Sequence, residues 1–259
     1  MDDAHNSELI RIVLDNLQPV LDSSLNVIQS EYEKTGKLRT SSPIERTPVE
    51  IYDIEVFQAA SSIASAISRL WQAKTYIENY PGDMNGKGTA HTQYDWIQYH
   101  YAFFISTVVS ISDLALILVN YVFRLGNPPK HCRQEIILKN EWVRETEISK
   151  RFGELDKLIR PYREFRNQLL HRGRMPKLPN NSEDSLLDYI SFYNVLLQSK
   201  PDVIPPELVN KAWQKERPQI SKLLQVDIRK LNVSINAFFN ELLPYYKAIR
   251  IKLDSQTGT

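Results

Sequence analysis

The sequence predicts an all-α protein, from three observations. Apolar residues recur at spacings of three and four through most of the chain, as they do on the buried stripe of an amphipathic helix. No stretch shows two alternating apolar and polar segments joined by a tight turn, so no β-hairpin is predicted. Proline and glycine gather between the periodic stretches, where helices begin and end.

The first helix is expected from Ser7 to about residue 34, and Pro19 is able to kink it. A polar connector follows over 37–49. The next helix covers about 50–80, where several alanines and serines permit close packing against neighbouring helices.

A long apolar helix is expected over about 93–125, after a glycine-bearing loop at 81–92. Its apolar run, 103–123, has the length of a membrane span. Asp113 at its centre would cost about 2.5–3.5 kcal/mol in a bilayer, and nearby serines weaken that interpretation further. A central helix buried inside the protein, without a membrane, is the better prediction.

The remaining elements are separated by short breaks. A short helix is expected within 130–145 and a longer one over 147–172, which Pro161 either kinks or restarts. A loop follows at 175–183. The last helices are expected at about 184–199, 206–216 and 217–253.

Length and composition fit a globular protein of one large or two small domains. The chain has 259 residues, 42% of them hydrophobic, which suffices for a sizeable core. We expect an N-terminal helix and connector (1–47), a helical bundle (48–175) and a C-terminal helical extension (176–259), packed together. The single cysteine, Cys132, excludes an internal disulfide, and the polar N-terminus predicts no signal peptide. A reducing, cytoplasmic location is therefore expected.

The helix at 147–172 carries the most informative residues. Its apolar stripe reaches Ile159 and Tyr162 in steps of three and four. Continued by one turn, the stripe brings Arg166 within about 40° of Tyr162. A guanidinium at the edge of a buried stripe needs a partner or a function. Asn167 and His171, four residues apart, share the adjoining face.

His171 lies in the last turn of this helix, because Gly173 is a typical left-handed cap and Pro176 forbids continuation. The negative end of the helix dipole favours an imidazolium there and nearby arginines oppose it, so His171 is expected to titrate near neutrality. Between Lys157 and Lys177, basic side chains outnumber acidic ones, and the resulting positive charge favours binding of a polyanion. Arg163, Arg172 and Arg174 are the residues expected to contact the phosphates of such a polyanion.

The string Arg166-Asn167-x-x-x-His171 near a helix end, preceded by Phe165, resembles the R-x4–6-H signature of the HEPN superfamily (higher eukaryotes and prokaryotes nucleotide-binding domains). The resemblance covers about residues 50–175. It implies a HEPN-like helical bundle, here with additional N- and C-terminal helices. Many members are metal-independent endoribonucleases of toxin–antitoxin, anti-phage and RNA-processing systems, which implies RNA as the substrate.

RNA cleavage without a metal needs a base for the 2′-hydroxyl, an acid for the 5′-oxygen and positive charge at the phosphate. We expect His171 to be the base or acid, Arg166 the phosphate clamp and Asn167 an orienting group. One imidazole cannot stand on both sides of the phosphate at once. A homodimer with two facing motifs is therefore expected, as in similar HEPN ribonucleases, giving a 2′,3′-cyclic phosphate and a 5′-hydroxyl.

The resemblance also implies a partner protein, either an antitoxin or a component of a defence system. In HEPN toxins paired with a minimal nucleotidyltransferase, a tyrosine two residues after the histidine is modified. This chain has Gly173 at that position. An antitoxin of that type is therefore not expected.

Two other functions stay open. A HEPN-like module can bind RNA or a partner protein without cleaving. Alternatively the chain is a helical scaffold, in which Arg166 pairs with Asp113 as a buried carboxylate and His171 has no chemical role. Asp113 would serve equally to brace Arg166 in a working site.

No metal or cofactor is expected, because the five histidines show no ligand spacing with one another, with cysteine or with acids. The segment 82–89 lacks the glycine–lysine spacing and the preceding strand of a phosphate-binding loop. The aromatic residues of 94–104 could stack bases, but packing in a core or dimer interface is the more common role.

Overall fold

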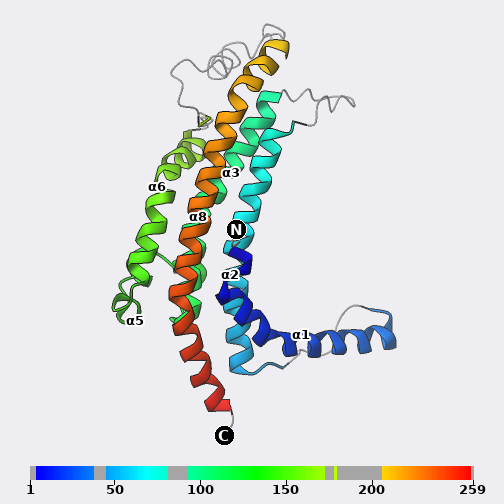
Figure 1. Ribbon diagram of the computed structural model, residues 1–259. Coiled ribbons are helices and arrows are strands. Elements are labelled where there is room, and N and C mark those ends of the chain that lie inside the picture. Colours follow the sequence, from blue (N-terminus) through cyan, green and yellow to red (C-terminus); the bar gives the residue numbers. More distant parts are fainter. Residues whose placement is uncertain (1–3, 38–44, 81–92, 173–177, 180–205, 258–259) are drawn as a thin grey trace. The chain divides into compact units, whose positions relative to one another are not determined.

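The computed structural model describes residues 4–37, 45–80, 93–172, 178–179 and 206–257, and within them every regular element is a helix (Figure 1). This confirms the all-α prediction. The long helices are α1 (Glu8–Thr35), α2 (Pro48–Glu78), α3 (Gln93–Val122), α6 (Ile148–Arg172) and α8 (Pro206–Thr257). The short ones are η1 (Ala4–Asn6), η2 (Pro129–His131), α4 (Gln134–Ile137) and α5 (Glu141–Arg144).

The chain divides into two compact units, and four of the long helices contribute to both. Unit 1 comprises residues 1–65, 112–154 and 234–259, and unit 2 comprises 66–111 and 155–233. Helices α2, α3, α6 and α8 each contribute one part to each unit. The expected loop at 81–92 and the expected helix at 184–199 lie outside the described residues.

Helix α1 forms where the N-terminal helix is expected, and both of its ends are capped. The Ser7 hydroxyl accepts a hydrogen bond from the Ile10 N–H at 3.3 Å. Gly36 ends the helix with φ 67°, a left-handed conformation that glycine adopts readily. Pro19 lies inside the helix without ending it.

Helix α3 is a core helix, as expected. From Asp95 to Val122 it is long and apolar enough to cross a membrane, but 61% of its most apolar window is buried inside the protein. Asn120, 3% exposed, is satisfied by hydrogen bonds to the Asn127 backbone: its Nδ2 donates to the carbonyl and its Oδ1 accepts from the N–H, both at 3.0 Å. Asp113, by contrast, is exposed rather than buried.

Helix α8 corrects the expectation of separate helices at 206–216 and 217–253. It runs unbroken through Pro218, although proline removes one backbone hydrogen bond and costs about 3 kcal/mol inside a helix. Trp213 and Ile220 are buried on either side of the proline, while the Pro218 ring itself is exposed. Apolar burial on both sides offsets the lost hydrogen bond.

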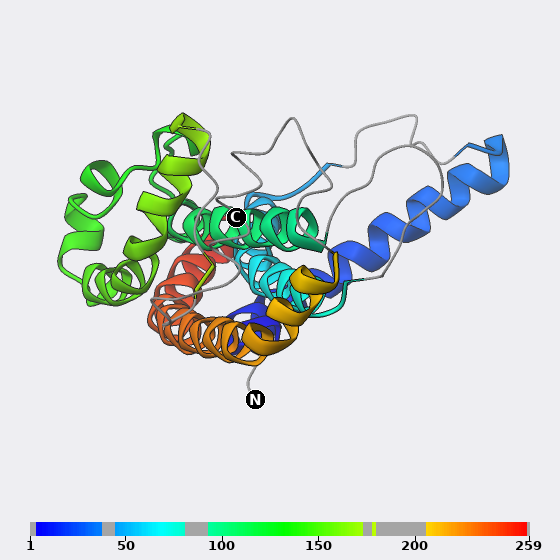
Figure 2. The ribbon, with the colours of Figure 1, turned by 90° about the horizontal axis from the view of Figure 1, so that it is seen from above.

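In unit 2, four helices pack in a closed cycle. Ser221 of α8 donates a hydrogen bond to Glu78 of α2, and the Trp96 indole of α3 donates to the Tyr76 carbonyl of α2 at 2.8 Å. Figure 2 shows this part of α2 between α3 and α8. The ring of Phe104 in α3 lies 6.0 Å from that of Tyr162 in α6, which in turn bonds to α8.

In unit 1, a buried carboxylate joins α1, α2 and α8. Asp53 is 1% exposed and accepts hydrogen bonds from Tyr246 Oη at 2.6 Å and Arg250 Nε at 3.0 Å. Asn16 Nδ2 in turn donates to Tyr246 Oη at 2.9 Å. Burial raises the pKa of the Asp53 carboxyl, and its two hydrogen-bond donors oppose that rise.

Replacing Asp53 by alanine should destabilise the protein strongly, because Arg250 and Tyr246 lose their acceptor. Breaking a fully buried ion pair costs about 3–5 kcal/mol. We expect about 2–4 kcal/mol here, because the Arg250 side chain is 27% exposed to solvent. Urea unfolding measures the change. Asp15→Ala, on the exposed face of α1, is the matched control and should stay within about 0.5 kcal/mol. Equal losses in both variants would contradict the role of Asp53.

Candidate functional site

Helix α6 positions the motif through its apolar face. Phe152, Leu155 and Ile159 are buried, and Tyr162, one turn further, is half-buried. Pro161 lies within the helix and does not restart it. The stripe predicted from the sequence is therefore the buried face of α6, and the residues after it continue on the same helix.

Tyr162 fastens the motif-bearing part of α6 to α8. Its hydroxyl donates a short hydrogen bond to Asp227 Oδ2. Burial, followed by the hydrogen bond to Asp227, raises the pKa of Tyr162 well above its ordinary value, so the phenol stays a donor at neutral pH. The sequence carries no signal for this contact, because Tyr162 and Asp227 are 65 positions apart and share no pattern.

Arg163, expected to contact RNA, is held within the protein by Asp156. Its guanidinium donates to both carboxylate oxygens of Asp156, whose side chain is 10% exposed. Arg160 also approaches Asp156, at 3.8 Å. The seven-residue spacing of Asp156 and Arg163 was a signal for this pair, since it places both on one helix face. An RNA contact of Arg163 stays a prediction and would compete with this ion pair.

Arg166 lies at the edge of the buried face, where the helical period placed it. The side chain is half-buried, and its Nε is buried with no hydrogen-bond partner among the described residues. Asp113, its expected buried partner, is exposed, so the scaffold interpretation lacks the buried carboxylate on which it depended. A buried guanidinium nitrogen without an acceptor is unfavourable by itself.

Asn167 and His171 lie together, as their spacing predicts. Both line a groove of about 260 Å³, which Glu164 and Gln168 complete. His171 and Asn167 are exposed to solvent. Arg166 is not among the residues that line this groove, because it lies on a different face of the helix. The sequence signal for Glu164 and Gln168 was their spacing of seven and three residues from His171.

Some expected residues lie beyond what the structure describes. Arg172 is the last residue of α6, and its side chain is outside the described part, as are Arg174, Gly173 and Pro176. Among the described residues, no three His, Cys, Asp or Glu side chains gather in a way that would hold a metal ion.

The aromatic residues of α3 pack partly against one another and partly against rings of α2 and α6. Tyr101 and Phe104 are buried, whereas Tyr99 is 68% and Phe103 41% exposed. The His100 ring lies 4.4 Å from Trp96 and 4.9 Å from that of Tyr76. Burial lowers the pKa of His100 below its ordinary value of 6.5, so this imidazole is neutral at physiological pH.

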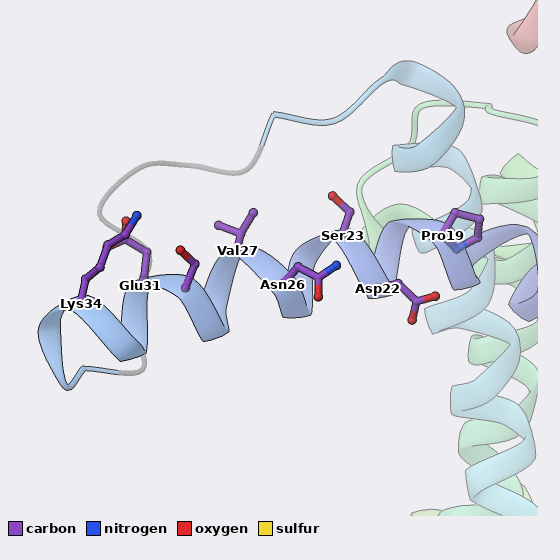
Figure 3. A pocket seen from close by; sticks show the side chains of 8 residues that line it. Pro19, Asp22, Ser23, Asn26, Val27, Glu31 and Lys34 are labelled. Carbon is purple, nitrogen blue, oxygen red and sulfur yellow. The ribbon is translucent and has the colours of Figure 1, made fainter.

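A second concavity lies along the later part of α1 (Figure 3). It is an open surface of mixed character, with Asp22, Glu31 and Lys34 beside Pro19 and Val27. The labelled side chains follow successive turns of one helix rather than converging on one point. Unlike the groove on α6, this surface has no histidine among the residues that line it.

In a comparison with protein families, the chain matches a family model described as Cthe2314-like HEPN over residues 52–238. The match covers more than two thirds of the chain and includes the whole motif. It continues into α8, past the boundary expected at 175. Comparisons with curated proteins and with solved structures gave no match.

Replacing Tyr162 by phenylalanine should lower the free energy of unfolding by about 1.5–3 kcal/mol, the range for a hydrogen bond to a charged group, because Asp227 is left half-buried without its donor. Chemical denaturation measures the loss. Tyr32→Phe, at an exposed position of α1, serves as the control. A Tyr162→Phe protein as stable as the control would show that this hydrogen bond does not secure α6.

Stability should fall on acidification, and His100 should contribute to the fall. Its folded pKa lies below the unfolded value of 6.5, so its contribution is present above that pH and is lost as the pH falls toward the folded pKa. His100→Phe keeps an aromatic ring and cannot take up a proton. We expect a smaller drop in melting temperature between about pH 7.5 and about pH 5.5 than in the wild type. An equal drop in both proteins would exclude this contribution.

Proposed function

The chain belongs to the HEPN family, and on this premise we propose that it is a metal-independent endoribonuclease. The observation that carries the proposal is the groove on α6, where Asn167 and His171 of the motif are both open to solvent. An imidazole that a substrate can reach is the minimum requirement for proton transfer in such a reaction.

In the proposed reaction, the ribose 2′-oxygen attacks the adjacent phosphorus as its proton passes to a base, and the bond from phosphorus to the 5′-oxygen breaks as an acid protonates that oxygen. His171 supplies one of these two groups, and Asn167 orients it. Arg166 stabilises the charge on the phosphate oxygens. The products are a 2′,3′-cyclic phosphate and a 5′-hydroxyl.

A homodimer is part of the proposal, because each chain has one imidazole in the motif and the reaction needs two proton-transfer groups. Two motifs facing each other across a two-fold axis would supply both. Leu170, within the motif, is 61% exposed, and an apolar side chain there suits burial in an interface. Arg166 does not line the groove on its own helix. In the dimer, Arg166 of one chain or the other would complete the site from outside that groove.

We further propose a role as a toxin or anti-phage effector in the cytoplasm, acting with an antitoxin or another defence protein. This role is inferred from the family resemblance. The reduced, buried Cys132 is compatible with that location. Arg163, Arg172 and Arg174 are proposed contacts to the RNA backbone.

The alternative is a module that binds RNA or a partner protein without cleaving. One observation favours it: Arg166 does not line the groove that contains His171. A binding module needs only the groove, whereas a nuclease needs the guanidinium near the phosphate. Binding that weakens with salt, without products, would support this alternative.

His171→Ala should lower the rate of RNA cleavage in the presence of a chelator by about 10²–10⁴-fold, the usual contribution of a general acid or base. Labelled single-stranded RNA, resolved by length, measures the rate. His131→Ala, an exposed histidine of η2, is the matched control and should keep the wild-type rate. Equal cleavage by the His171→Ala and wild-type proteins would refute the assigned role.

A further inference from the structure

The open face of α6 carries a carboxylate and an amide in the same groove as the motif. Glu164 and Gln168 are four residues apart, and His171 follows Gln168 by three, so the three side chains share one helix face. At about 1.5 Å of rise per residue, Glu164 lies about 10 Å along the helix axis from His171. One nucleotide spans a distance of this order from its phosphate to the far edge of its base.

A hydrogen bond between the two side chains determines what they offer a ligand. Gln168 Nε2 donates to Glu164 Oε1 over 3.5 Å. An ionised carboxylate only accepts hydrogen bonds, and the Gln168 amide keeps a second N–H. The pair therefore presents carboxylate acceptors at Glu164 beside a donor at Gln168.

Guanine has the complementary edge. Its N1–H and N2–H can donate side by side to a carboxylate, while its O6 accepts from an amide N–H. Adenine and cytosine have an acceptor ring nitrogen beside their amino group, and uracil has a carbonyl oxygen on each side of its N3–H. Against Glu164, each of these three bases leaves an acceptor facing an acceptor.

The charges on α6 favour a base rather than a phosphate at this end of the groove. Arg160 and Arg163 approach Asp156, and in the part of the chain that the structure describes Glu164 forms no ion pair. Its negative charge therefore repels a phosphate. His171, at the other end, carries an imidazole N–H that can donate a hydrogen bond to a phosphate oxygen. The groove has a base end and a phosphate end.

We propose that Glu164 and Gln168 select guanine in the nucleotide whose 2′-hydroxyl attacks, an inference that rests on the proposed ribonuclease function. Glu164 binds the N1–H and N2–H of the base, and Gln168 binds its O6. The protein then cuts single-stranded RNA on the 3′ side of guanosine.

The test uses random-sequence RNA, incubated with the full chain and a chelator, and sequencing of the fragments that end in a cyclic phosphate. Guanine should exceed uracil at the cut nucleotide by roughly 10- to 100-fold, the discrimination of a bidentate base contact. Glu164→Gln replaces one acceptor by a donor and should remove most of this excess while cutting continues. Glu154→Gln, at an exposed carboxylate of the same helix outside the groove, should retain it.

Cuts without a guanine excess, or an excess that Glu164→Gln preserves, would overturn the guanine assignment and leave the ribonuclease function intact. If the wild type makes no cuts, the ribonuclease function fails, and nucleotide binding decides the base contact. Guanosine and uridine 3′-monophosphates are then titrated while the Gln168 side-chain amide is followed by NMR. Tighter guanosine binding that Glu164→Gln abolishes supports the contact, and equal affinities overturn it.

Discussion

The helical period of α6 is the constraint on which the candidate site depends. Phe152, Leu155 and Ile159 turn toward the core, and this fixes the direction of every later side chain on the helix. Arg166 falls at the edge of the buried face, while His171 falls on the open one. A shift of one residue would rotate both side chains by about 100° around the helix axis. The packing of the preceding turns of α6 therefore sets the direction in which the motif side chains point.

Each unit joins α8 to a neighbour by the same kind of contact, a tyrosine hydroxyl that donates to a carboxylate. Tyr246 bonds to Asp53 in unit 1, and Tyr162 bonds to Asp227 in unit 2. Burial, and then the neighbouring carboxylate, raises the pKa of both tyrosines, so both remain donors across the physiological range. Directional bonds of this kind fix the rotation of a helix, which apolar contacts alone constrain less.

The helices were predictable from the sequence because apolar period and capping residues agree locally. The break expected in α8 was wrong. Proline usually ends a helix, but the burial of Trp213 and Ile220 on either side of Pro218 stabilises the unbroken helix. Exposed Asp113 was equally misjudged, because an apolar neighbourhood in sequence does not say which face a residue occupies. The groove was predicted in part: spacing joined Asn167 to His171, whereas contacts across 65 positions leave no local pattern.

The chemistry of the RNA ends tests the central claim most directly. Transesterification at the 2′-oxygen leaves a 2′,3′-cyclic phosphate and a 5′-hydroxyl, and needs no metal. Mass spectrometry of RNA incubated with the protein in chelator should find both ends in equal amounts. Intact RNA, or ends with a 3′-hydroxyl and a 5′-phosphate, would contradict the assignment of the α6 groove as a metal-independent ribonuclease site.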